Sequence, residues 1–254
     1  MAVAGSCAHA APEEIQVYMD EMDRPGEIGL DSHINYVARG DATTGTVGQQ
    51  QSLHQLRLTP EFSYGITPNL EAGLYLPLAT LDGAGHAGAY GIKGRLKYIA
   101  PRAEGQDWWI GANFELGRVG HQLDINPWNA EFKGIIGTQK GPWILAFNLN
   151  LDFVVSGPQR SPLSFDGDTK VSYSITRKLA LGIESYNGLG DTRAFGRFGG
   201  NEHSTFVTVD TALGPWDLNL GLGRGYGANP DHLIVKAIIG VPIDRLFHHR
   251  PVGP

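Results

Sequence analysis

Three basic side chains recur at every second position of one stretch, Lys93, Arg95 and Lys97. Residues two apart in a β-strand point to the same side, so these cations would form a ladder on one face. Other stretches carry acidic and basic residues in the same alternation. The candidate lumen or solute-binding residues are Arg57, Glu61, Glu71, Lys93, Arg95, Lys97, Glu115, Glu131, Lys133, Asp152, Asp168, Lys170, Glu184 and Lys236. Either these charges pair with one another, because buried charges need partners, or they line a narrow aqueous passage whose basic stripe attracts anionic or polar solutes.

Catalysis and metal binding have little support in the sequence. His203 and Ser204 are adjacent, but the G-x-S-x-G turn that many serine hydrolases build around the nucleophile is missing. Glu61 and Glu71 could form the carboxylate pair of a glycosidase, yet chance gives such a pair in a chain with so many acids on one face. No clustered His and Cys spacing suggests zinc. We therefore predict no catalytic residue, no metal site and no cofactor.

The elements that carry these charges are predicted to be strands. From Glu27 onward, the chain divides into segments of roughly 10–13 residues with period-two alternation. In the segment from His54 to Gly65, for example, leucines and aromatic residues alternate with Gln, Arg, Thr, Glu and Ser. The pattern gives about twelve strands, each with one apolar and one polar face. The 35 glycines and 15 prolines, which weaken helix interiors, also favour an all-β chain.

Strand length and aromatic placement favour a transmembrane barrel over a soluble lipocalin-like barrel or sandwich. Strands of soluble proteins average about 5–6 residues, whereas a tilted transmembrane strand needs about 9–11. Tryptophans stand at or near the starts of four segments, on the apolar face, as in the aromatic girdles of membrane barrels. These four are Trp108, Trp128, Trp143 and Trp216.

The connections alternate between short and long. Tight links such as 139–142 and 176–178 alternate with longer ones such as 39–52 and 187–202. An up-and-down meander across a membrane has tight turns on the periplasmic side and long loops outside. Closure into a barrel is expected because an open sheet edge in hydrocarbon would leave backbone groups without hydrogen bonds.

The chain ends are predicted to lie outside the barrel. Ala8-His9-Ala10 resembles a small-x-small cleavage site, so residues 1–10 are interpreted as a truncated signal peptide. Residues 11–26 are acidic around a few apolar positions and could be a periplasmic tail, a short helix or a segment folded into the lumen; the tail is preferred. Residues 27–243 would form the barrel, and residues 244–254 a disordered tail.

Several strings of the sequence resemble a known family. "YGITPNLEAGLYLPL" is similar to the strand–turn–strand signature of the phenol-degradation (meta-pathway) putative transporters of Gram-negative outer membranes. "KGRLKYIAP", "PWNAEFKGIIG", "GIESYNGLG" and "LGRGYG" resemble uncharacterised proteobacterial outer-membrane proteins. The resemblance spans most of the chain from about Glu14 to Ile243 and implies a barrel with a transport role, without supplying functional residues.

The sequence therefore predicts an all-β, antiparallel up-and-down transmembrane barrel of the bacterial outer membrane. Its predicted role is a channel or transporter for a small solute, with anionic and aromatic compounds as candidates. The alternatives are a structural or adhesive barrel that binds partners through its extracellular loops and, less favoured, a membrane-embedded enzyme. The expected partners are outer-membrane lipid and the solute. The net charge of −6 argues against nucleic acid, and a monomer is expected.

Overall fold

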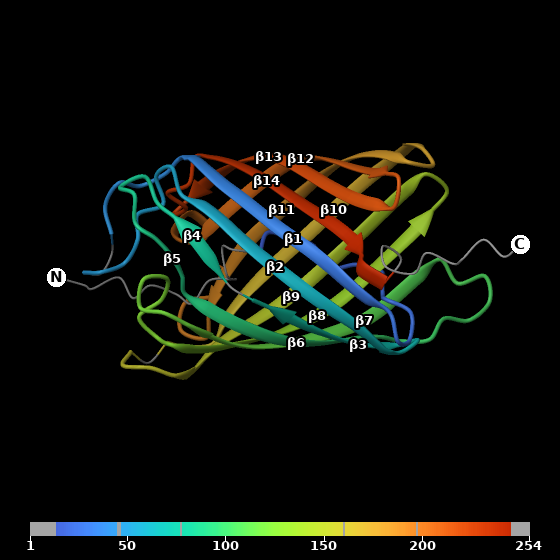
Figure 1. The fold of residues 1–254 in the computed structure, drawn as a ribbon, viewed down its shortest axis with the longest axis horizontal. Helices are drawn as coiled ribbons and strands as arrows, with labels where there is room; N and C mark the ends of the chain where they lie inside the picture. Colours follow the sequence, from blue (N-terminus) through green and yellow to red (C-terminus); the bar gives the residue numbers. More distant parts are fainter. Residues whose placement is uncertain (1–13, 45–46, 77, 160, 197, 245–254) are drawn as a thin grey trace, which may run out of the picture.

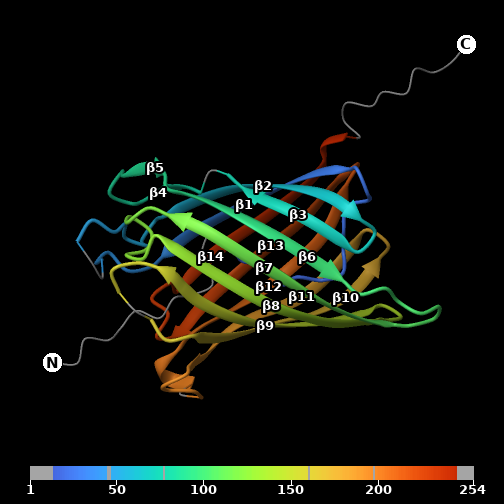
Figure 2. The ribbon, with the colours of Figure 1, turned by 90° about the horizontal axis from the view of Figure 1, so that it is seen from below.

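The chain folds into a closed antiparallel barrel whose strands run obliquely to the long axis (Figures 1 and 2). The structure is a computed structural model that describes residues 14–44, 47–76, 78–159, 161–196 and 198–244. The cleavage site and residues 1–13, and residues 245–254 of the predicted tail, lie outside the described residues. Among the described residues no helix is long and apolar enough to cross a lipid bilayer.

Twelve strands of the described chain close the barrel, which confirms the predicted fold. The strands are β1 (Ile28–Arg39), β2 (Leu56–Thr67), β3 (Leu70–Tyr75), β6 (Gly91–Ile99), β7 (Trp108–Val119), β8 (Trp128–Lys140), β9 (Trp143–Ser156), β10 (Ser164–Thr176), β11 (Leu179–Asp191), β12 (Glu202–Leu213), β13 (Trp216–Gly227) and β14 (Leu233–Pro242). Each pairs with its neighbours, and β1 closes the sheet by pairing with both β2 and β14. The short strands β4 (Ala79–Leu81) and β5 (Ala87–Ala89) form a hairpin that extends the barrel wall beyond β3 through pairing of β4 with β2.

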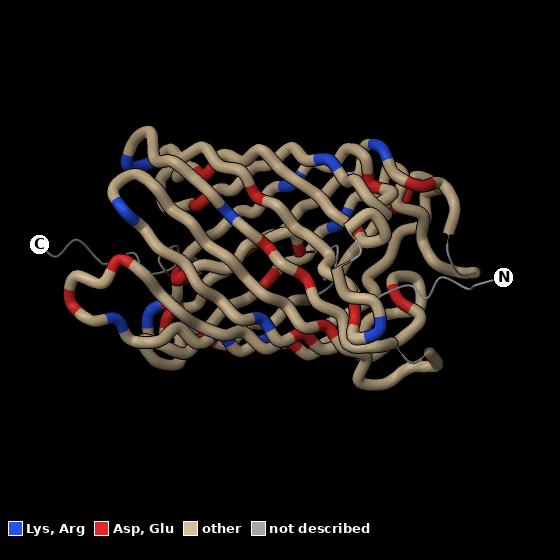
Figure 3. The backbone as a smooth tube through the Cα atoms, turned by 180° about the vertical axis from the view of Figure 1, so that it is seen from behind, with Lys and Arg blue, Asp and Glu red and all other residues tan. Residues whose placement is uncertain are grey.

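The alternation of the sequence becomes an outer apolar surface and an inner polar one. Leu74, Phe147 and Leu220 are about two-fifths exposed on the outside, at 39%, 41% and 43%. The basic ladder of Lys93, Arg95 and Lys97 is buried inside. A dry core of leucines with cations outside would have excluded a membrane barrel, and the structure shows the reverse. Charged positions therefore run along the strands of the barrel as well as its end loops (Figure 3).

The two ends of the barrel differ as predicted. Tight links, such as 141–142 and 177–178, gather at the end where β1 begins and β14 finishes. Longer connections, including 40–55 and the β4–β5 hairpin, occupy the other end (Figure 1). The four tryptophans predicted to lie in the girdle are each the first residue of a strand and are exposed: Trp108, Trp128, Trp143 and Trp216. We refer to the ends as the short-turn end and the long-loop end.

Residues 14–24 run through the inside of the barrel, and we call this segment the N-terminal plug. The preferred interpretation of a tail outside the barrel is therefore replaced by the third alternative, a segment folded into the lumen. Val17 and Tyr18 pack in a buried cluster with Ile99, Trp109 and Ile135, which point inward from β6, β7 and β8. The lumen near the short-turn end thus has an apolar core that the two-faced strand pattern did not predict.

Gly65 lets the plug leave the lumen at the short-turn end. The Gly26 N–H donates to the Gly65 carbonyl at 2.8 Å, and the Gly65 N–H donates to the Glu27 carbonyl at 3.1 Å. A Cβ added at Gly65 would lie 2.2 Å from the Arg24 carbonyl oxygen. The chain can therefore pass this close to β2 only because residue 65 has no side chain.

Candidate functional site

Every residue predicted to face the lumen is buried inside the barrel. The set comprises Arg57, Glu61, Glu71, Lys93, Arg95, Lys97, Glu115, Glu131, Lys133, Asp152, Asp168, Lys170, Glu184 and Lys236. Their positions follow from strand register, because inward-facing residues of adjacent strands lie opposite one another. Glu71 of β3 lies opposite Lys97 of β6, and Glu115 of β7 opposite Arg95. The structure thus gathers these side chains in one lumen; their role toward a solute stays a prediction.

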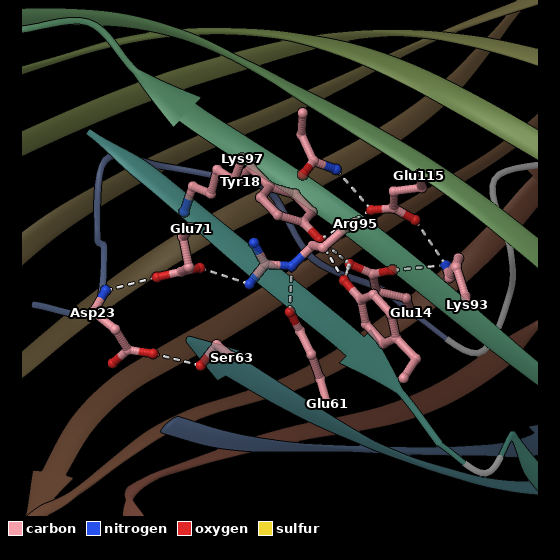
Figure 4. Close-up of polar contacts among 12 residues, drawn as sticks. Glu14, Tyr18, Asp23, Glu61, Ser63, Glu71, Lys93, Arg95, Lys97 and Glu115 are labelled. Carbon is pink, nitrogen blue, oxygen red and sulfur yellow. Dashed lines mark hydrogen bonds and ion pairs between the residues drawn. The ribbon is translucent and has the colours of Figure 1, made fainter. Parts of the chain in front are cut away.

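The basic ladder is neutralised by carboxylates on both sides. Arg95 contacts Glu61 through Nε and donates from Nη2 to Glu71 at 2.8 Å (Figure 4). Lys93 Nζ lies 3.0 Å from Glu14 and 2.9 Å from Glu115. A buried cation paired in this way satisfies the requirement that charges out of water find partners.

Gly73 makes room for the central arginine of the ladder. It lies opposite Arg95 in the β3–β6 register, and a Cβ there would come within 2.6 Å of the Arg95 side chain. The guanidinium can therefore lie flat across β3 and reach both Glu61 on β2 and Glu71 on β3. Because the planar guanidinium carries several N–H donors in a fixed arrangement, a single arginine can pair with two carboxylates at once.

Tyr18 anchors the plug at the centre of this charged network. Its hydroxyl lies 2.6 Å from a Glu14 oxygen, 3.1 Å from Glu115 and 2.5 Å from the Tyr75 hydroxyl. Lys133 Nζ lies over its ring, 4.4 Å from the centroid, an arrangement that favours a cation against the negative face of the aromatic system. Figure 4 shows Tyr18 enclosed by the acidic and basic groups of the barrel wall.

The backbone of the plug is held by side chains of the barrel. Asn148 of β9 accepts from the Tyr18 N–H at 2.7 Å and donates to the Tyr18 carbonyl at 2.9 Å. Lys97 donates to the Glu21 carbonyl at 2.7 Å, and Lys236 of β14 donates to the Ile15 carbonyl at 2.9 Å. These contacts satisfy polar backbone groups that have no strand partner in the lumen. The plug is therefore bound by specific contacts along its length.

Glu14 is the acidic residue of the plug that pairs with the basic ladder, through Lys93. Burial alone would raise the pKa of Glu14, but the positive charges of Lys93 and Lys133 outweigh burial. The pKa of Glu14 consequently lies well below its usual value, and the docked plug holds an ionised carboxylate.

A second charge cluster lies on the opposite side of the plug. Glu184 of β11 contacts Lys236 and lies 3.1 Å from Lys170 Nζ. Lys170 also pairs with Asp210 at 2.9 Å. This cluster again balances cations with carboxylates, and through Lys236 it touches the plug backbone.

A cavity of about 430 Å³ opens above the plug toward the long-loop end. Glu14 and Ile15 line the cavity together with loop residues such as Gln50 and Asn229. Arg57 and Lys93 are the basic side chains among the described lining residues, and the acidic ones are more numerous: Glu14, Glu115, Asp124, Glu131, Asp152, Asp166, Asp168, Glu202 and Asp231. The cavity is a charged vestibule, and Glu14 and Ile15 of the plug form part of its lining.

The groups considered for catalysis have structural partners. His203 lies 3.2 Å from the Asn187 side-chain oxygen and 2.7 Å from the Phe198 carbonyl, so both ring nitrogens are engaged. Glu61 and Glu71 both bind Arg95. In the described part of the chain, no three His, Cys, Asp or Glu side chains converge as metal ligands would.

The plug contacts were missed because the sequence has no alternation before Glu27. Tyr18 stands among acids in a stretch that also suits an exposed tail. The one available signal was the combination of an aromatic residue with several acids, which complements a basic ladder. Trp109 was missed for a different reason, since its neighbour Trp108 already satisfied the expected girdle position.

Comparisons with known proteins match the fold. The sequence matches no family model and no curated protein, so the resemblance to the phenol-degradation transporters stays a prediction. A solved KdgM porin has a TM-score of 0.54 at 10% identity, over 84% of this chain and 98% of the porin. A solved NanC porin has a TM-score of 0.51 at 9% identity, over 84% of this chain and 97% of the porin. The chain thus shares the β-barrel fold of these two porins.

Proposed function

We propose that this protein is an outer-membrane channel for a small solute, and that the N-terminal plug controls passage through its lumen. The observation that carries the proposal is a closed barrel, apolar outside, with a charged vestibule that ends on the N-terminal plug. A closed barrel satisfies its backbone groups without an edge and suits a lipid surround. The likeness to porins supports the same role. The long-loop end would face the outside of the cell, as in other barrels of this kind.

The size of the vestibule sets the size of the solute. A cavity of about 430 Å³ lies within the usual range of roughly 300–1,000 Å³ for small-molecule sites. A solute would enter between the long loops and stop at Glu14 and Ile15. Passage then requires a second arrangement in which the plug leaves the lumen, and a solute or signal that favours this arrangement would open the channel.

The basic ladder is not the part of the lumen that would attract a solute. Lys93, Arg95 and Lys97 are used to hold carboxylates and the plug. An anionic solute would have to displace those partners, and each displaced carboxylate would be left buried without its cation. The ladder therefore supports a structural role in closing the lumen more than a role in anion uptake.

Single-channel recording in planar bilayers tests the proposal. Wild-type protein should be closed for most of the time, and Tyr18→Ala, which removes the central anchor of the plug, should conduct more often. Tyr98→Ala, a substitution of the same kind on the outer face, should behave as wild type. Heat-modifiable migration on a gel checks that each variant is folded. Folded Tyr18→Ala protein that never conducts would refute the channel.

A further inference from the structure

A polar patch interrupts the apolar outer face of the barrel near the long-loop ends of β11, β12 and β13. The face is identified by register, because Ile183 of β11, Val207 of β12 and Leu222 of β13 lie side by side and are exposed. Residues two and four positions nearer the long loops share this outer face. We call these six residues the outer polar patch: Ser185, Asn187, His203, Thr205, Arg224 and Tyr226.

Four members of the outer polar patch form a ring of hydrogen bonds. Asn187 Nδ2 donates to the Ser185 hydroxyl at 3.0 Å, and the Tyr226 hydroxyl donates to Asn187 Oδ1 at 3.4 Å. Thr205 Oγ1 lies 3.2 Å from both the Ser185 and the Tyr226 hydroxyl oxygens. Each hydroxyl gives its one proton to a neighbour in the ring, while its oxygen has room for a second donor. The ring therefore suits a partner that carries hydroxyl groups.

Arg224 adds a positive charge beside this ring. It is exposed, and its neighbours on the outer face are Leu222, Tyr226 and, directly opposite on β12, Thr205, all of them uncharged. Within the described part of the chain, no residue forms an ion pair or a hydrogen bond with its guanidinium group. A cation on an otherwise apolar face is unfavourable in lipid unless an anion accompanies it. Since a planar guanidinium matches two oxygens of a phosphate, Arg224 suits a phosphorylated partner.

Exposed aromatic side chains border the outer polar patch. The loop between β11 and β12 contains the short helix η1 (Phe198–Gly200), and the Phe198 ring stacks on His203 with centroids 4.0 Å apart. Phe195 of the same loop packs edge-on against Phe165 of β10. Phe195 and Phe198 are both exposed. The partner therefore meets apolar surface on two sides, from this loop and from the outer face itself.

We infer that the outer polar patch binds the head group of a phosphorylated glycolipid, with a phosphate on Arg224 and saccharide hydroxyls on the hydrogen-bonded ring. The acyl chains would lie along Val207 and Leu222, which continue the outer face toward the short-turn end. This lipid combines the anion, the hydroxyl groups and the apolar chains that the patch and its borders accommodate. With the long-loop end facing outward, as proposed above, the matching lipid is lipopolysaccharide. The inference goes beyond the proposed channel, because the site lies outside the lumen.

Native mass spectrometry of the folded barrel, released from detergent micelles, tests the inference. The probes are diphosphorylated lipid A and, as a phosphate lipid without a saccharide, phosphatidylglycerol. Lipid A should bind at least tenfold more tightly than phosphatidylglycerol. Arg224→Gln should weaken lipid A binding by about tenfold to a hundredfold, because the charge-assisted hydrogen bonds to phosphate are lost. Thr205→Val, which breaks the ring, should weaken it by about threefold to tenfold.

Arg118→Gln is the matched control. Arg118 is also an exposed arginine near the long-loop end, opposite Ile92 and Trp128 on the outer face, and its variant should bind lipid A as the wild type does. An equal loss in Arg118→Gln would overturn the inference, since any charge at this end would then serve. Unchanged binding in folded Arg224→Gln or Thr205→Val, or equally tight phosphatidylglycerol, would overturn it as well. Conductance plays no part in these measurements, so the channel and the lipid site stand or fall separately.

Discussion

Replacing Asn148 with leucine should release the N-terminal plug while leaving the barrel intact. The Asn148 side chain makes two hydrogen bonds, of 2.7 and 2.9 Å, to the backbone of Tyr18, and no part of Asn148 is exposed. Leucine has similar volume but would leave a buried N–H and a buried C=O unpaired. Each unpaired group costs about 1–3 kcal/mol. The two groups together give a loss of about 2–6 kcal/mol, which corresponds to a rise of roughly 30- to 25,000-fold in the undocked fraction of the plug.

Thiol labelling measures that fraction directly. Val17 is buried in the docked plug, so a Val17→Cys reporter in a Cys7→Ser background should react with a maleimide only when the plug undocks. The labelling rate should rise in proportion to the undocked fraction. Asn219→Leu removes a lumen amide that contacts Glu184 and Asp210 instead of the plug backbone, and should label as the parent does. A labelling rate within twofold of the parent in Asn148→Leu would refute the view that these two bonds hold the plug.

Three further outcomes are expected. Arg95→Met should lower the free energy of unfolding in lipid vesicles by about 3–5 kcal/mol, because Glu61 and Glu71 lose their shared cation. A loss below about 1 kcal/mol would contradict a stabilising role of these ion pairs. Adding Glu61→Gln and Glu71→Gln to Arg95→Met should restore most of the stability. Leu149→Arg, at the middle of the outer face of β9, should cost about 2–4 kcal/mol in the same urea titration, whereas Leu213→Arg at the end of β12 should cost about 0–1 kcal/mol; equal costs would argue against a bilayer around the barrel. Acidification should open the channel. Glu14 lies against Lys93, Lys133, His33 and Tyr75, and its pKa is lower when the plug is docked than when it is undocked. The ionised Glu14 therefore stabilises the docked plug above the ordinary carboxyl pKa of about 4.3, and this stabilisation is lost as the pH falls further. Burial raises the pKa of Asp23, so this group changes docking with pH in the opposite direction. The open probability is therefore compared between the wild type and Glu14→Gln, which should open more often at pH 7 and should gain less on acidification. An identical dependence of open probability on pH in the two proteins would show that Glu14 does not control docking.

The barrel and the direction of its side chains could be predicted from the sequence. Period two is a local property, so the alternation around Lys93, Arg95 and Lys97 is enough to place them on one face of a strand. Their burial then follows because the other face, with Ile92, Leu96 and Tyr98, is apolar and exposed. The tryptophans at strand starts and the alternating loop lengths are also local features, and they predict a membrane around the barrel. For these reasons the residues predicted to face the lumen are buried in the structure, while their role toward a solute stays a prediction.

Which charges meet, and what fills the lumen, was decided only by the tertiary structure. Glu14 and Lys93 are far apart in sequence, and their contact depends on a plug that carries no periodic signal. The pairing of the basic ladder with the plug follows from register across several strands and from one chain segment passing through the closed barrel. A sequence pattern fixes the face on which a side chain lies. Only the closed sheet brings opposite walls within a few ångströms of one another and of the plug, and therefore decides which cation neutralises which acid.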